Sequence, residues 1–197
     1  MSEIKKRDWE TLFENMNPAR FDVPKRFPPE QYEPLLIHVK DGWSLLDAGC
    51  ATANLYKYTK KRNISYTGMD IDQHLLDGAR ERHPEANLKL GSIMDIPFLD
   101  NDFDVVYVRS VLEHIHPDEI DIAINELVRV AKRMLILSFH NPPSRRRDKT
   151  RTKTKNRYFE NTFSKFVLLN LIKKTGRFID IETYMSFGRR IWIVTLK

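Results

Sequence analysis

Two acidic residues flank a turn of small residues between positions 44 and 70. Asp47 stands in an apolar run that leads into the turn Gly49 to Ala53, and Asp70 ends the next apolar run. A small-residue turn lets the backbone approach a ligand closely, and a carboxylate about 20 residues further on can accept hydrogen bonds from ribose hydroxyls. The spacing therefore predicts a nucleoside-binding βαβ unit.

The turn differs from the dinucleotide-binding fingerprint, which has three glycines and places a pyrophosphate at a helix N-terminus. Here only Gly49 is a glycine, and Asp47 precedes it. The carboxylate of Asp47 would repel a pyrophosphate but suits a ligand with a cationic head, so a nucleoside that carries an amino-acid group, S-adenosylmethionine, fits better. Ala51 and Ala53 tolerate positive φ poorly, so the turn is either ordinary in conformation or slightly strained.

The rest of the chain supplies elements that can position such a site. Apolar periodicity and helix-terminating residues predict helices and strands that alternate along the sequence, which indicates a parallel sheet with right-handed crossovers. The last two strands are separated by five residues, too few for a parallel crossover, so they must form an antiparallel hairpin. The predicted helices are 30–39, a helix from 53, 73–82, 117–131 and 162–175, and the predicted strands are 44–48, 64–69, 87–90, 103–108, 134–137, 178–185 and 191–196.

Several further motifs occur in the same order as in a known family. They are Leu45-Leu46-Asp47-Ala48-Gly49-Cys50, Tyr66-Thr67-Gly68-Met69-Asp70, Gly91 with Ile96-Pro97-Phe98, Phe103-Asp104-Val105-Val106 and Val111-Leu112-Glu113-His114-Ile115. With these motifs the chain resembles the class I S-adenosylmethionine-dependent methyltransferases, in their broad small-substrate branch, from about Leu45 to Lys197. The resemblance implies a Rossmann-like three-layer α/β sandwich, with a seven-stranded, mostly parallel sheet that ends in an antiparallel hairpin strand.

The resemblance also implies a set of residues that bind the cofactor. Ser92 stands where such enzymes have an acid that accepts from the adenine amino group; its neutral hydroxyl is a weaker acceptor, and Asp95 is an alternative. Arg109 and Ser110 leave the fourth strand at its carboxyl end, where ligands bind in open α/β sheets. One of their backbone carbonyls, or the Arg109 side chain, is expected to face the methionine moiety. The implied set is Asp47, Gly49 and Ala51 on the methionine and ribose side, Asp70 and Ile71 at the ribose, Ser92 and Ile93 at the adenine, and Arg109 and Ser110.

Titratable residues follow directly after Ser110. Glu113, His114 and His116 are the nearest candidates for a general base, and histidine suits neutral pH. The alternative for His114 is a family position that is often histidine without serving as the base. A metal site formed with His140 is a further alternative, but no carboxylate pattern accompanies these histidines, so no metal is predicted.

A strongly basic segment follows the fifth strand. Eight of the thirteen residues from Arg145 to Arg157 are basic and one is acidic. We predict a charged loop within 141–160, in which Arg145, Arg147 and Tyr158 contact an anionic acceptor or RNA. The alternative is a solvated loop with no ligand.

Composition bounds the class of protein. The chain has 197 residues with 41% hydrophobic content, enough for one α/β domain, predicted at 30–197, behind an N-terminal cap or arm at 1–29. No apolar run reaches about eighteen residues and the N-terminus has no hydrophobic signal core, so a cytoplasmic protein without a membrane segment is predicted. The single cysteine, Cys50, fits a reducing compartment.

The predicted function is transfer of a methyl group from S-adenosylmethionine to an O or N atom of a small-molecule or glycan acceptor, which leaves S-adenosylhomocysteine. An anionic acceptor would agree with the net charge of +6. One alternative is an RNA methyltransferase that uses residues 145–157. The other is a non-catalytic protein that retains the fold, as the departures at Ala51, Ala53 and Ser92 allow.

Overall fold

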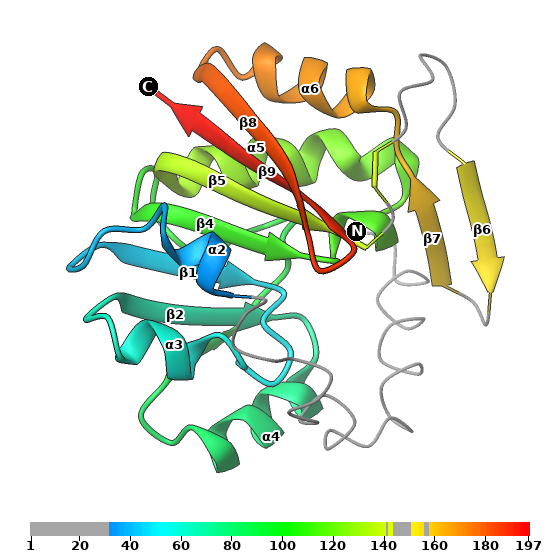
Figure 1. The fold of residues 1–197 in the computed structure, drawn as a ribbon. Coiled ribbons are helices and arrows are strands. Elements are labelled where there is room, and N and C mark those ends of the chain that lie inside the picture. The colour runs from blue at the N-terminus through cyan, green and yellow to red at the C-terminus, as the bar shows by residue number, and fades with distance from the viewer. Residues whose placement is uncertain (1–31, 141, 144–150, 156–157) are drawn as a thin grey trace.

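A computed structural model describes residues 32–140, 142–143, 151–155 and 158–197 (Figure 1). The predicted N-terminal arm, residues 1–29, lies outside the described residues. Within the described part, no helix is both long enough and apolar enough to cross a membrane.

A seven-stranded sheet forms the centre of the molecule, with the order β3-β2-β1-β4-β5-β9-β8. Strands β1 to β5 run parallel, whereas β9 pairs antiparallel with both β5 and β8. The predicted Rossmann-like fold and its C-terminal hairpin are confirmed. The strands are β1 Ser44–Ala48, β2 Ser65–Asp70, β3 Asn87–Leu90, β4 Phe103–Arg109, β5 Ala131–Phe139, β8 Phe178–Ser186 and β9 Arg189–Leu196.

Helices cover both faces of this sheet. Leu46 on β1 packs in one core cluster with residues of α5 and α6, and Leu45 packs in the other cluster with residues of α2. This division follows from the strand geometry, because successive side chains point to opposite faces. The helices are α2 Glu33–Leu36, α3 Tyr56–Lys60, α4 Gln73–Arg82, α5 Ile120–Val130 and α6 Lys165–Lys174, with short 3-10 turns η3 Leu112–His114 and η4 Pro117–Glu119.

The order of the strands reverses between β1 and β4. From β1 the chain proceeds to β2 and β3 on one side, and β4 and β5 lie on the other side. In open α/β sheets a ligand binds in the crevice outside the carboxyl ends of the strands at such a switch point. The segments that follow β1, β2 and β4 therefore frame the expected site.

We predicted a basic loop at 141–160, but part of this segment forms two strands, so the prediction was wrong there. β6 Arg151–Lys155 and β7 Tyr158–Thr162 form an antiparallel hairpin of their own. The sequence Arg-Thr-Lys-Thr-Lys alternates β-branched and charged residues, a pattern that favours a strand, and the density of charge obscured it. Figure 1 shows this hairpin beside the sheet, beyond the carboxyl ends of β4 and β5.

Four predicted helix boundaries were wrong. The helix predicted from 53 begins only at Tyr56, because Ala53 has a φ of +54°, which an α-helix does not allow. The helix predicted at 162–175 begins only at Lys165, because β7 extends to Thr162. The helix predicted at 117–131 starts as the 3-10 turn η4, and its last residue already belongs to β5. The helix predicted at 30–39 is helical only over Glu33–Leu36 in the described residues.

Candidate cofactor and active site

Gly49 begins the turn after β1. Its N–H and that of Cys50 both donate to the carbonyl of Met69, at 2.7 and 3.0 Å, which ties the turn to the end of β2. The φ of Gly49 is +84°, and a Cβ added there would lie 2.3 Å from Cγ2 of Val111. Glycine is therefore required at this position by conformation and by space.

The sequence left open whether the backbone at Ala51 and Ala53 is ordinary or strained. In the structure it is strained at both residues. Their φ angles are +47° and +54°, in the left-handed region. This costs about 1 to 2 kcal/mol per residue relative to a right-handed conformation. The turn keeps this conformation because the Ala51 N–H donates to Asp70 and the Ala53 N–H donates to the carbonyl of Cys50.

Asp70 joins the turn to the end of β2. Its Oδ2 accepts from the Ala51 N–H at 2.8 Å, and its Oδ1 accepts from the Asp72 N–H at 3.0 Å. Burial raises the pKa of Asp70 to about 6, against these backbone donors, which favour the charged form. Each carboxylate oxygen has a second lone pair, so the residue is still able to accept from ribose hydroxyls.

Asp47 is buried beneath the turn. Its Oδ2 accepts from the hydroxyl of Tyr66 at 2.9 Å. Desolvation raises the pKa of Asp47 to about 7, although the Tyr66 hydrogen bond and the charge of Arg109 favour the ionised form. Near neutral pH the charge of Asp47 is therefore easily shifted by a neighbouring cation.

Replacing Asp47 with Asn should change how stability depends on pH. The folded pKa of about 7 lies above the ordinary value of 3.8, so the folded state holds the proton more tightly, and the Asp47 contribution to stability is lost as pH rises from about 4 to 7. Asp47→Asn should match the wild type near pH 4 and be more stable by about 1 kcal/mol or more near pH 8. Urea denaturation across this range measures the difference.

The exposed Asp121 in α5 provides the control for this comparison. Asp121→Asn should leave the pH profile of the wild type unchanged. If the profiles of Asp47→Asn and the wild type run parallel from pH 4 to 8, the titration of Asp47 is not linked to folding.

The segment predicted to contact the adenine forms a tight turn next to Asp70. The N–H of Gly91 donates to the carbonyl of Asp70 at 2.9 Å, which fixes the start of the segment. The hydroxyl of Ser92 accepts from the Met94 N–H at 3.2 Å, Ile93 is buried, and the predicted alternative Asp95 is exposed. Ser92 thus stabilises the turn on which it lies.

Arg109 lies at the end of β4 against an aromatic residue that the sequence analysis did not single out. Its Nη1 donates to the hydroxyl of Tyr32 at 2.5 Å, and its Cζ lies 4.9 Å from the centre of the Tyr32 ring. Ser110, which follows, has a φ of +52° and its hydroxyl accepts from Arg189 at the start of β9. Sequence reasoning did not find Arg189, because it lies 79 residues after Ser110 along the chain.

Two buried hydroxyls were also missed by sequence reasoning. Tyr107 on β4 is paired in register with Asp47, and Ser138 on β5 is paired with Arg109. Neither hydroxyl has a hydrogen-bond partner in the part of the chain that the structure describes. A polar residue inside an otherwise apolar strand is the only sequence signal for them. Buried unsatisfied polar groups are costly, so these two are candidates for contact with a ligand or an ordered water.

The predicted general-base candidates lie in the turns after β4. Glu113 is buried and accepts from the backbone N–H of His140. His116 is the residue before η4, and its Nδ1 accepts from the Asp118 N–H at 3.3 Å. The structure thus gives Glu113 and His116 roles in holding backbone, whereas His114 is half-buried in η3.

The hairpin β6–β7 reaches this region through its second strand. β7 packs against η3, and the buried Asn161 donates from Nδ2 to the carbonyl of Ile115 at 2.7 Å. Of the predicted substrate contacts, Arg145 and Arg147 lie outside the described residues. The backbone of Tyr158 is described in β7, but its side chain is not. Among the residues that the structure describes, no three His, Cys, Asp or Glu side chains are grouped as metal ligands.

Strand order and pairing define a Rossmann-like α/β domain, and comparisons with known proteins show what it resembles. Residues 46–137 match the family model described as a methyltransferase domain. This match runs from β1 to β5 and covers somewhat under half of the chain, so it marks a resemblance to that family.

Curated relatives match parts of the chain. A malonyl-[acyl-carrier protein] O-methyltransferase of Pectobacterium atrosepticum is 27% identical over 53% of this chain and 40% of its own length. A demethylmenaquinone methyltransferase of Listeria welshimeri is 29% identical over 67% of this chain and 61% of its own length. The chain therefore matches less than two thirds of the length of either relative.

A solved structure matches nearly the whole fold. It is the 1,6-didemethyltoxoflavin-N1-methyltransferase of Burkholderia thailandensis with bound 1,6-didemethyltoxoflavin and S-adenosylhomocysteine. The TM-score is 0.72 at 13% identity, over 98% of this chain and 88% of that one. At this identity the match establishes a shared fold.

Proposed function

We propose that the chain transfers a methyl group from S-adenosylmethionine to an acceptor. The observation that carries the proposal is the buried carboxylate of Asp70, which holds the Gly49 turn to the end of β2 at the switch point of the sheet. The relatives named above are methyltransferases, and the structure of the Burkholderia enzyme contains S-adenosylhomocysteine, the product that S-adenosylmethionine leaves after methyl transfer. Both facts support the proposal.

The residues of the site fit this cofactor. Gly49 has a left-handed backbone that allows a tight turn after β1, at the edge of the sheet where a nucleoside approaches in such folds. Asp70 accepts from the ribose hydroxyls, while Ile71, Ser92 and Ile93 surround the adenine. Asp47 favours the cationic amino-acid end, because a positive charge nearby stabilises its ionised form against the desolvation that raises its pKa.

The sulfonium of the cofactor supplies a methyl group that is already activated. The side chains therefore need mainly to bind the acceptor, align it and exclude water. Such positioning can supply much of the rate enhancement in a methyl transfer. The lone pair of the acceptor atom forms the new bond to the methyl carbon as the carbon–sulfur bond breaks, and S-adenosylhomocysteine leaves. For a hydroxyl acceptor, we assign removal of the proton to His114 in η3, because an imidazole suits proton transfer near neutral pH.

Isothermal titration calorimetry with S-adenosylhomocysteine tests the cofactor assignment. We expect saturable binding in the micromolar range and no binding of NAD, whose pyrophosphate is repelled by Asp47 and does not fit a turn with one glycine. Absence of heat with millimolar S-adenosylhomocysteine would overturn the assignment. Binding without transfer of a radiolabelled methyl group to any acceptor would favour a non-catalytic protein that retains the fold.

For the acceptor, we propose an O or N atom of a small molecule or glycan that bears an anionic group. Burial lowers the pKa of Arg189, and the charge of Arg109, which lies near it at the carboxyl edge of the sheet, lowers it further. Two partly buried guanidinium groups in this arrangement favour a carboxylate or phosphate between or beside them. The hydroxyls of Tyr107 and Ser138 provide further donors on the same face of the sheet.

Arg189→Gln should raise the KM for acceptors that carry a carboxylate or phosphate by about tenfold or more, the range expected for a charge-assisted hydrogen bond. Transfer of a radiolabelled methyl group to these acceptors and to their uncharged esters measures the effect. Arg190→Gln is the matched control, because successive side chains of β9 point to opposite faces. Equal KM changes in both variants, or no preference for charged acceptors, would contradict the anionic class.

A further inference from the structure

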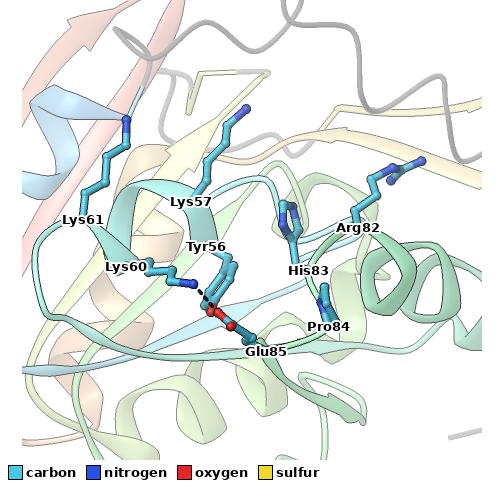
Figure 2. Close-up of a pocket in the computed structure, with 8 residues that line it drawn as sticks. All are labelled: Tyr56, Lys57, Lys60, Lys61, Arg82, His83, Pro84 and Glu85. Atoms are coloured by element: carbon cyan, nitrogen blue, oxygen red, sulfur yellow. Dashed lines mark hydrogen bonds and ion pairs between the residues drawn. The ribbon is translucent and has the colours of Figure 1, made fainter.

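A second cavity lies away from the cofactor site, between α3 and the end of α4 (Figure 2). Its volume is about 400 Å³, within the range of small-ligand sites. None of its lining residues belongs to the predicted catalytic, cofactor or substrate set. Its lining includes Tyr56, Lys57, Lys61, Arg82, His83 and Glu85.

The cavity carries an excess of positive charge. Four of its lining residues are cationic and one, Glu85, is acidic; this acid forms an ion pair with Lys60. In the described part of the chain, neither Lys57 nor Lys61 takes part in an ion pair. Figure 2 shows the side chains of Lys57, in α3, and Lys61, directly after α3, extending in the same direction on the side away from the Tyr56 ring. They are four residues apart, about one helical turn, so their ammonium groups can contact successive charges of one ligand.

Aromatic rings lie among these cations. The ring centres of Tyr56 and His83 are 5.5 Å apart, and Tyr56 is also 5.5 Å from the buried Tyr66. These contacts, together with the Lys60 ammonium 6.0 Å from the centre of the Tyr56 ring, hold the ring in place while it remains partly exposed. A fixed aromatic ring near cations is the combination by which proteins bind unpaired nucleotides, through base stacking and phosphate contacts.

We propose that this α3–α4 cavity binds single-stranded nucleic acid, with phosphates on Lys57, Lys61 and Arg82 and a base against Tyr56 and His83. A polynucleotide is favoured over a free nucleotide because the cations come from two helices, so their charges extend over more than one phosphate. The overall charge of +6 is in agreement with an anionic polymer. The inference does not depend on methyl transfer.

Fluorescence anisotropy with a labelled oligouridine tests the proposal. The double variant Lys57→Ala/Lys61→Ala should bind about tenfold more weakly than the wild type near physiological salt. The slope of log affinity against log salt should fall in magnitude by about 1.4, since each phosphate contact on a single strand contributes about 0.7. The control is Lys173→Ala/Lys174→Ala, which removes the same charge from the exposed end of α6.

Calorimetry with S-adenosylhomocysteine on the same variants shows whether each variant is folded with an intact cofactor site, independently of oligouridine binding. Retained cofactor binding with weakened oligouridine binding supports the proposal, whatever the outcome for methyl transfer. No oligouridine binding by the wild type, or equal weakening in both double variants, would overturn it. Equally tight binding of polyglutamate would show a general polyanion surface, and equally tight binding of uridine monophosphate would show a mononucleotide site; each result rejects the polymer assignment.

Discussion

Gly49→Ala is expected to destabilise the protein by about 2 to 5 kcal/mol and to weaken S-adenosylhomocysteine binding severely. About 1 to 2 kcal/mol arises because alanine at a φ of +84° is strained. A further 1 to 3 kcal/mol, roughly, arises from overpacking, since the new Cβ would lie 2.3 Å from Cγ2 of Val111. Relief of this overlap requires the turn to move, and the turn is the proposed contact surface for the cofactor. Urea denaturation and calorimetry measure the two effects.

Gly42→Ala separates the two causes. Gly42 has nearly the same φ, +82°, but an added Cβ would meet nothing within 4 Å. This variant should lose only the conformational part, about 1 to 2 kcal/mol, and keep its cofactor affinity. Adding Val111→Ala to Gly49→Ala should restore part of the stability, a coupling that a double-mutant cycle detects. Equal losses at the two glycines, without rescue, would show that the contact with Val111 has no role.

Asp70→Ala is expected to reduce S-adenosylhomocysteine affinity by at least about tenfold, as for the loss of a charge-assisted hydrogen bond of about 1.5 kcal/mol. The change also leaves the N–H groups of Ala51 and Asp72 without their acceptor. Since the Ala51 bond helps to hold a left-handed residue, stability should fall as well, by about 1 to 3 kcal/mol. Asp70→Asn keeps one acceptor oxygen and should be intermediate. Calorimetry and urea denaturation measure both quantities.

The pH dependence of binding identifies the role of Asp70 more sharply. Its pKa is about 6 in the folded chain, and ribose hydroxyls donate best to the ionised form. Wild-type affinity for S-adenosylhomocysteine should therefore fall as pH drops below about 6, and Asp70→Asn should not show this decrease. As a control, Asp72→Ala removes the N-cap bond to the Leu75 N–H and should cost about 1 kcal/mol of stability without a change in affinity. Wild-type affinity in Asp70→Ala would refute the assignment.

Much of the fold was predictable from local patterns. Short apolar or alternating runs, each followed by a turn or a helical period, marked the strands of the seven-stranded sheet. The gap of five residues between the last two predicted strands was sufficient to predict an antiparallel hairpin, since no crossover fits in it. In the structure the gap is shorter still, two residues between β8 and β9. Gly49 and Asp70 were identifiable because their spacing reflects a single βαβ unit, which is local in sequence.

The β6–β7 hairpin shows where local patterns were insufficient. Most of its first strand is charged, which is typical of a solvated loop. The alternation of β-branched and charged residues, which favours a strand, was the weaker of the two signals. Whether such a segment forms strands depends on packing against the rest of the protein. Here that packing includes the bond from Asn161 to the carbonyl of Ile115, 46 residues away.

The sequence by itself determined the α/β fold class, the glycine turn after β1 and the carboxylate after β2. The tertiary structure decided that Ala51 and Ala53 take the left-handed conformation, and that Tyr107, Ser138 and Arg189 join Arg109 at one edge of the sheet. The physical reason is that periodicity and turn chemistry act over a few residues, whereas strand order and register bring together residues such as Ser110 and Arg189, 79 positions apart.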